Sequence, residues 1–128
     1  FLTGKYNDGI PVDSRPTQEG YEWLIEDLEM RKKNGEVEIV RNLTSYASKN
    51  FNCTTAQLAL AWCLKNQNVS TILLGATKPE QMIENLGCIE VAEKMTEQHM
   101  SDIDEILGNK PEDWIGYGGA GPRQLRTL

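Results

Sequence analysis

The sequence predicts an α/β fold, of which this chain forms one part. A short run of apolar and β-branched residues at 69–74, bounded by turn residues, is typical of a parallel strand buried on both faces. Around it, apolar residues recur at helical spacing along most of the chain. A parallel strand needs neighbouring strands on its edges, and the sequence contains no second strand pattern. We therefore expect the 128-residue chain to belong to a larger α/β protein.

Five helices are predicted, after a glycine- and proline-rich loop over residues 1–15. Residues that favour helix boundaries mark several of their ends, such as Thr54 or Thr55 before the third helix and Gly108 after the last. The third helix has few polar positions and is expected to be largely buried. The predicted helices cover residues 16–33, 36–50, 55–65, 78–86 and 96–107.

Composition excludes several classes of function. The net charge of −6 argues against binding to nucleic acid or to anionic lipid, and no stretch reaches the ~20 apolar residues of a membrane span. Three widely spaced cysteines and a single histidine, His99, do not form a zinc pattern, so no metal site is expected. The chain starts at Phe1 without a signal segment, which predicts a piece of a longer intracellular protein with reduced cysteines.

The segment 69–86 is the strongest candidate for a binding site. A strand is followed by a turn containing Gly75 and then by a helix, and the N–H groups at the start of such a helix favour an anion. Thr77 adds a hydroxyl donor, and Thr77 with Glu80 predicts a capping box. Spacings of three and four residues place Gln81, Glu84 and Asn85 on one helix face, where their polar groups suit a nucleotide base. The alternative interpretation is an ordinary capped amphipathic helix with a solvated face.

Other polar residues carry weaker signals. Lys5 and Arg15 lie in the N-terminal loop, where basic residues often meet phosphate but are more often simply solvated. His99 is expected to face solvent near the start of its helix. No nucleophile, base and orienting group can be assembled around a single histidine, so no catalytic residue is predicted.

Several motifs, in the same order along the chain, resemble the aldo-keto reductases and, among them, the voltage-gated potassium channel beta subunits. The resemblance covers about residues 1–111, and its first, third and last motifs favour the channel-subunit branch over general reductases. The matching motifs are Leu-Thr-Gly-Lys-Tyr at 2–6, Gly-Ile-Pro at 9–11 with Ser14 and Arg15, Gly-Tyr-Glu-Trp-Leu at 20–24, Cys-Thr-Thr-Ala-Gln-Leu-Ala-Leu-Ala-Trp-Cys-Leu at 53–64, Leu-Leu-Gly-Ala-Thr at 73–77 with Glu80, Gln81, Glu84 and Asn85, and Ile-Leu-Gly-Asn-Lys-Pro at 106–111.

The resemblance implies the C-terminal portion of a (β/α)8 TIM barrel, with residues 69–74 as its eighth strand. It implies NADP as the cofactor, although Gln81 stands where many reductases carry Arg; Gln is usual in the channel-subunit branch. The catalytic Tyr, Asp, Lys and His of the family would lie upstream of this segment. Carried over position by position, Lys5 and Arg15 would lie along the pyrophosphate, Gly75, Thr77 and Gln81 would meet the phosphate on the adenosine ribose, and Glu84 and Asn85 would meet the adenine.

The same resemblance implies partners and a location for the parent protein. It would be a cytoplasmic homo-tetramer at the inner face of the plasma membrane, bound to a voltage-gated potassium channel alpha subunit, regulating gating and trafficking and reducing aldehydes or ketones with NADPH. Residues 1–111 would belong to the barrel domain, and residues 112–128 are predicted to form a flexible Gly-rich tail. Two alternatives stay open: a stand-alone NADPH-dependent aldo-keto reductase without a channel partner, and a small helical interaction module without a cofactor.

Overall fold

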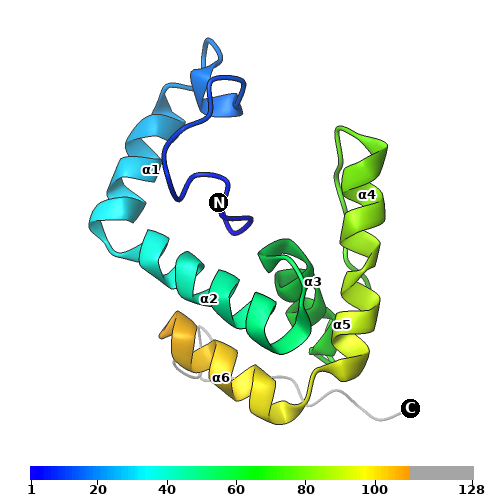
Figure 1. Ribbon diagram of the computed structural model, residues 1–128. Helices are drawn as coiled ribbons and strands as arrows, with labels where there is room; N and C mark the ends of the chain where they lie inside the picture. Colours follow the sequence, from blue (N-terminus) through cyan, green and yellow to red (C-terminus); the bar gives the residue numbers. More distant parts are fainter. Residues whose placement is uncertain (110–128) are drawn as a thin grey trace, which may run out of the picture.

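The computed structural model describes residues 1–109 as a set of helices arranged in an open U (Figure 1). The N-terminal loop leads through a short 3-10 helix into the first arm, and α4 forms the opposite arm. The remaining helices make the base between the arms. The elements are η1 Arg15–Thr17, α1 Trp23–Lys33, α2 Glu36–Phe51, α3 Thr55–Lys65, α4 Pro79–Leu86, α5 Cys88–Lys94 and α6 Glu97–Leu107.

The core lies in the base of the U, where α2, α3, α5 and α6 meet. Leu58 of α3 is 2% exposed and Ile103 of α6 is 3% exposed. Ala47 and Ala61 are fully buried, and their small side chains let α2 and α3 approach closely. The buried cluster comprises Leu43, Ala47, Leu58, Ala61, Cys88, Val91, Met95 and Ile103.

Local capping residues set several helix boundaries as the sequence predicts. Thr54 caps α3, because its Oγ1 accepts a hydrogen bond from the Gln57 N–H at 3.3 Å. Gly108 ends α6 in the left-handed conformation, with φ 59°, which costs a glycine little. Gly35, with φ 79°, separates α1 from α2 in the same way. These glycines and hydroxyls therefore confirm the predicted ends of three helices.

The predicted strand over residues 69–74 is wrong for the described conformation. The segment is extended, but no strand occurs among residues 1–109. Between residues 70 and 76 no backbone hydrogen bond to another described residue is present. Leu73 is 92% exposed, although its neighbours Ile72 and Leu74 are partly covered. A strand exists only when neighbouring strands receive its N–H and C=O groups, and this part of the chain supplies none.

Two further predictions need correction, and one helix was missed. The first helix begins at Trp23 instead of residue 16, because residues 15–17 form a separate 3-10 turn. The helix α5 was not predicted, since its seven residues follow Gly87, which marks a helix end in most sequences. The helix α3 is only partly buried: Leu64, near its end, is 40% exposed.

His99 is partly buried instead of facing solvent fully as predicted, because it joins the contact between α2 and α6. Its ring meets the Phe51 ring edge to face, with the centroids 4.7 Å apart. Its Nδ1 accepts the Thr96 N–H at 3.0 Å, which caps α6. Next to it, the Tyr46 hydroxyl donates to Asp102 Oδ2 at 2.8 Å. The contact between α2 and α6 therefore combines aromatic packing with a charged hydrogen bond.

The Tyr46–Asp102 contact predicts a pH-dependent loss of stability at alkaline pH. Burial, together with the hydrogen bond and the charge of Asp102, raises the pKa of Tyr46 to about 12. In the unfolded chain this pKa is about 10. A raised folded-state pKa stabilises the fold fully below about pH 10, and this contribution is lost between about pH 10 and 12. We expect Tyr46→Phe to remove this component, measured by denaturant unfolding across that range with tyrosinate absorbance in parallel. Identical pH profiles for the two proteins would contradict the assignment.

None of the helices among residues 1–109 is long and apolar enough to cross a membrane.

Candidate cofactor site

The start of α4 gathers three hydrogen-bond donors around one oxygen atom. The Thr77 N–H and the Thr77 hydroxyl donate to Gln81 Oε1 at 2.9 and 3.1 Å, and the Lys78 N–H donates to the same oxygen at 3.3 Å. Pro79 is the first residue of the helix, where its missing N–H leaves no donor unsatisfied. These three donors form a small cradle for one acceptor oxygen. In this conformation that oxygen is Oε1 of the Gln81 side chain.

The predicted capping box between Thr77 and Glu80 is therefore wrong by one residue. Because α4 begins at Pro79, Lys78 is the N-cap and Gln81 is the third helical residue. The side chain at that third position reaches back to the N-cap N–H, and here it belongs to Gln81 instead of Glu80. The proline sets this register, since a proline is accepted readily in the first turn of a helix.

The remaining predicted residues of this segment lie along α4 and its approach. Gly75 is exposed, and no described atom lies within 4 Å of the position that a Cβ would take there. Glu84 is exposed and Asn85 is half-buried. The apolar side of α4 is also open, with Ile83 72% and Leu86 52% exposed. The polar and apolar sides of α4 are thus both accessible in the described part of the chain.

Lys5 and Arg15 lie apart from this group. Both belong to the N-terminal part of the chain, across the opening of the U from α4 (Figure 1). The Lys5 ammonium sits 5.8 Å from the centre of the Tyr6 ring, and the Arg15 guanidinium 5.7 Å from that of Tyr21. The described conformation therefore does not bring Lys5 and Arg15 together with the predicted site residues of α4.

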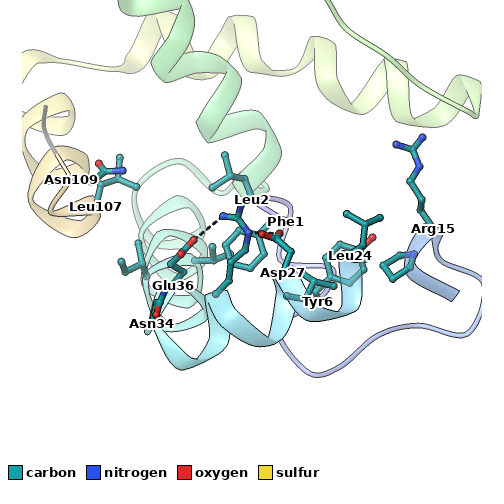
Figure 2. A pocket seen from close by; sticks show the side chains of 15 residues that line it. Phe1, Leu2, Tyr6, Arg15, Leu24, Asp27, Asn34, Glu36, Leu107 and Asn109 are labelled. Atoms are coloured by element: carbon teal, nitrogen blue, oxygen red, sulfur yellow. Dashed lines mark hydrogen bonds and ion pairs between the residues drawn. The ribbon is translucent and has the colours of Figure 1, made fainter. Parts of the chain in front are cut away.

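Arg15 borders a large cavity between the N-terminal loop and helices α1 and α2 (Figure 2). The cavity measures about 810 Å³. A second arginine, Arg31, also lines it, but its guanidinium is bonded to Asp27 at 2.7 Å and to Glu36 at 2.8 Å. Arg15 makes no ion pair with any described residue, so its charge remains available to an anion. The wall is otherwise mainly apolar, from residues such as Leu24 and Val40.

The thiols and acids of residues 1–109 form no group of three or more that could hold a metal ion. Burial raises the pKa of the Cys53 and Cys88 thiols, which reduces their thiolate fraction and their reactivity. These groups give no basis for nucleophilic chemistry in this part of the chain.

One functional candidate was not predicted from the sequence. Gln57 of α3 donates from Nε2 to the Glu84 carbonyl of α4 at 2.7 Å. This contact joins residues 27 positions apart. The Thr54-x-x-Gln57 spacing predicts that Gln57 takes part in a capping box of α3. It does not predict the contact with α4.

Comparison with known protein families gives the class of protein. The profile of the Aldo/keto reductase family matches residues 1–108. Since this match covers most of the chain, the protein belongs to the aldo/keto reductase family. Members of this family are oxidoreductases that generally use NAD(P)H to reduce carbonyl compounds. The predicted tail, residues 112–128, lies outside both the match and the described residues.

Proposed function

We propose that this chain supplies the NADP(H)-binding part of an aldo/keto reductase barrel that reduces aldehydes or ketones. The observation that carries the proposal is the cradle at the start of α4, where three donors from Thr77 and Lys78 converge on Gln81 Oε1. Three convergent donors at a helix start suit a phosphate oxygen. These donors fit the phosphate on the adenosine ribose of NADP(H), whose oxygen would take the place of Gln81 Oε1.

The other residues fit further parts of the same cofactor. Glu84 and Asn85, three and four residues beyond Gln81, offer a carboxylate and an amide to the adenine. Lys5 and Arg15 provide positive charge for the pyrophosphate, and Arg15 has no competing ion pair among the described residues. When bound, the nicotinamide would supply hydride to a carbonyl carbon. The proposal requires the N-terminal loop and α4 to approach each other more closely than in Figure 1.

Exposed apolar side chains on residues 73–86 support a partner structure that covers this segment. Leu73, Ile83 and Leu86 are all more than half exposed, at 92%, 72% and 52%. Apolar residues concentrated on one segment and the following helix favour burial against another part of a protein. Strands of a barrel, placed against the extended segment 69–74, would cover these residues and satisfy its backbone. This surface is what distinguishes the proposal from a complete small helical module.

Cofactor titration tests the proposal directly. The longest natural polypeptide that carries this sequence is titrated with NADPH and, separately, with NADH, and binding is followed by calorimetry. We expect saturable binding with a preference for NADPH, because the cradle contacts the phosphate that NADH lacks. Absence of binding by both nucleotides would overturn the proposal. Equal affinity for both would remove the ribose phosphate from the cradle.

We further propose that the parent protein is a cytoplasmic, tetrameric beta subunit of a voltage-gated potassium channel. The support is in the sequence: Gly4-Lys5-Tyr6, Gly-Tyr-Glu-Trp-Leu at 20–24 and Ile-Leu-Gly-Asn-Lys-Pro at 106–111 resemble that branch. Co-purification with the cytoplasmic domain of a channel alpha subunit would support this assignment. NADPH binding without co-purification would favour the alternative, a stand-alone reductase.

A further inference from the structure

Gln57 uses both ends of its side-chain amide, and each end serves a different helix. Its Oε1 accepts the Thr54 N–H at 3.0 Å, which completes the capping box of α3. Its Nε2 donates to the Glu84 carbonyl at 2.7 Å. Glu84 lies in the last turn of α4, and its carbonyl also accepts the Gly87 N–H at 3.1 Å. A single half-buried side chain therefore links the start of α3 to the end of α4.

Gly87 leaves the space that this link needs. A Cβ at Gly87 would lie 2.4 Å from Gln57 Nε2 and 3.1 Å from the Glu84 carbonyl oxygen. Its backbone is helical, with φ −59° and ψ −14°, so glycine is not required there by conformation. The close approach of the Gln57 amide explains why glycine, which has no side chain, stands at position 87 between α4 and α5.

Capping alone does not explain glutamine at position 57. The capping box accepts either Glu or Gln at this position, because only the acceptor oxygen is used. Donation to a carbonyl requires the amide nitrogen, which a glutamate lacks. Among the described residues, this is also the one side-chain hydrogen bond that connects α4 to another helix. The second bond therefore has a separate task, which is to hold the end of α4.

We propose that Gln57 is a positioning residue for the adenine end of the cofactor site. It touches no part of the proposed cofactor, but it fixes the turn of α4 that carries Glu84 and Asn85. Helix α4 packs against α3 and α5 but is largely exposed, so the loss of this bond should let its last turn shift. The inference rests on the proposed function, since it is the cofactor that gives these two side chains a task.

Two substitutions separate the cap of α3 from the bridge to α4. Gln57→Glu keeps the acceptor for the Thr54 backbone N–H and removes the donor to α4. Thr54→Ala removes the hydroxyl that accepts the Gln57 backbone N–H and leaves both hydrogen bonds of the Gln57 side-chain amide in place. Both are made in the longest natural polypeptide that carries this sequence. Affinity is measured for NADPH and for reduced nicotinamide mononucleotide, which has no adenine, and stability by denaturant unfolding.

We expect Gln57→Glu to weaken NADPH binding about 5-fold, the loss of roughly one hydrogen bond, and to leave affinity for the mononucleotide unchanged. Amide hydrogen exchange in residues 79–87 should become faster in this variant. Thr54→Ala should lower stability without changing either affinity. Gly87→Ala should reproduce the NADPH loss when Gln57 is present and should add less to Gln57→Ala, since the added Cβ then meets only the Glu84 carbonyl oxygen, at 3.1 Å.

The outcomes distinguish this inference from the proposed function. If the wild-type protein binds NADPH and Gln57→Glu binds it equally well, Gln57 has no positioning role and the proposed function stands. Equal losses for NADPH and for the mononucleotide would assign the effect to general damage and would also overturn the inference. If the wild-type protein binds no NADPH, the proposed function falls and Gln57 keeps only its structural link, visible in the exchange of residues 79–87.

Discussion

Arg15→Ala is expected to weaken NADPH binding about 10- to 100-fold, the effect of losing a charge-assisted hydrogen bond to a phosphate. Arg15 lines the large cavity, and among residues 1–109 its guanidinium has no ion-pair partner that a phosphate would have to displace. Stability should change little, because the side chain is exposed. The measurement is calorimetric titration of both proteins with NADPH.

Arg41→Ala is the matched control for this experiment. Arg41 carries the same charge, but it is bonded to Asp8 at 2.9 Å and to the Asn7 carbonyl at 3.0 Å, away from the cavity that Arg15 lines. Both variants change the net charge equally, so a loss of affinity in both would indicate general electrostatics. Unchanged affinity for Arg15→Ala would remove Arg15 from the cofactor site, while leaving the cradle at α4 to be tested separately.

Leu73→Ala is the second prediction with a large expected effect, and it tests whether the extended segment is covered in the intact protein. In the described conformation Leu73 is 92% exposed, so the substitution should change the free energy of unfolding by less than about 0.5 kcal/mol. If barrel strands cover the segment, as the proposed function requires, the same change should cost about 2–5 kcal/mol. We expect the larger value in the longest natural polypeptide that carries this sequence, measured by denaturant unfolding.

Leu58→Ala calibrates the comparison. Leu58 is 2% exposed at the centre of the core, so its truncation should cost about 2–5 kcal/mol whether or not a barrel is present. A Leu73→Ala effect close to that of Leu58→Ala would indicate that the segment is buried. A value near zero, with a large effect at Leu58, would mean that the segment stays exposed, and the barrel part of the proposal would fall.

The helices that were predicted well carry two kinds of local signal: the spacing of their apolar residues and the capping residues at their ends. For α3 and α6, the apolar spacing and the capping residues Thr54, Thr96 and Gly108 lie within the element itself, so the sequence alone locates them. The missed helix α5 follows Gly87, which adopts a helical conformation. Because glycine usually marks the end of a helix, the sequence pattern gave no sign that a helix continues after it. The strand at 69–74 could not be settled locally, since its formation depends on hydrogen-bond partners elsewhere.

In the candidate site, too, contacts between residues close in sequence could be predicted, and contacts between distant residues could not. Thr77 and Gln81 are four residues apart, and their contact follows from helix geometry, although the register set by Pro79 was misjudged by one position. The separation of Lys5 and Arg15 from α4 depends on how distant parts of the chain pack, which no motif encodes. Gln57 was missed for the same reason, because its partner lies 27 residues away. Only the resemblance to a family predicts that these groups meet at one cofactor, and the described conformation does not bring them together.

The succession of helix contacts along the chain has a consequence for how the protein folds. Apart from the meeting of α2 with α6, the larger contacts join helices that are adjacent in the chain, such as α1 with α2, or separated by a single helix, as α3 is from α5. Local contacts close short loops and form quickly, whereas strand pairing across long distances forms slowly. We therefore expect the helical base to fold first and the apolar segment 69–74 to remain uncovered until late. During that interval the nascent protein would depend on chaperones to avoid aggregation.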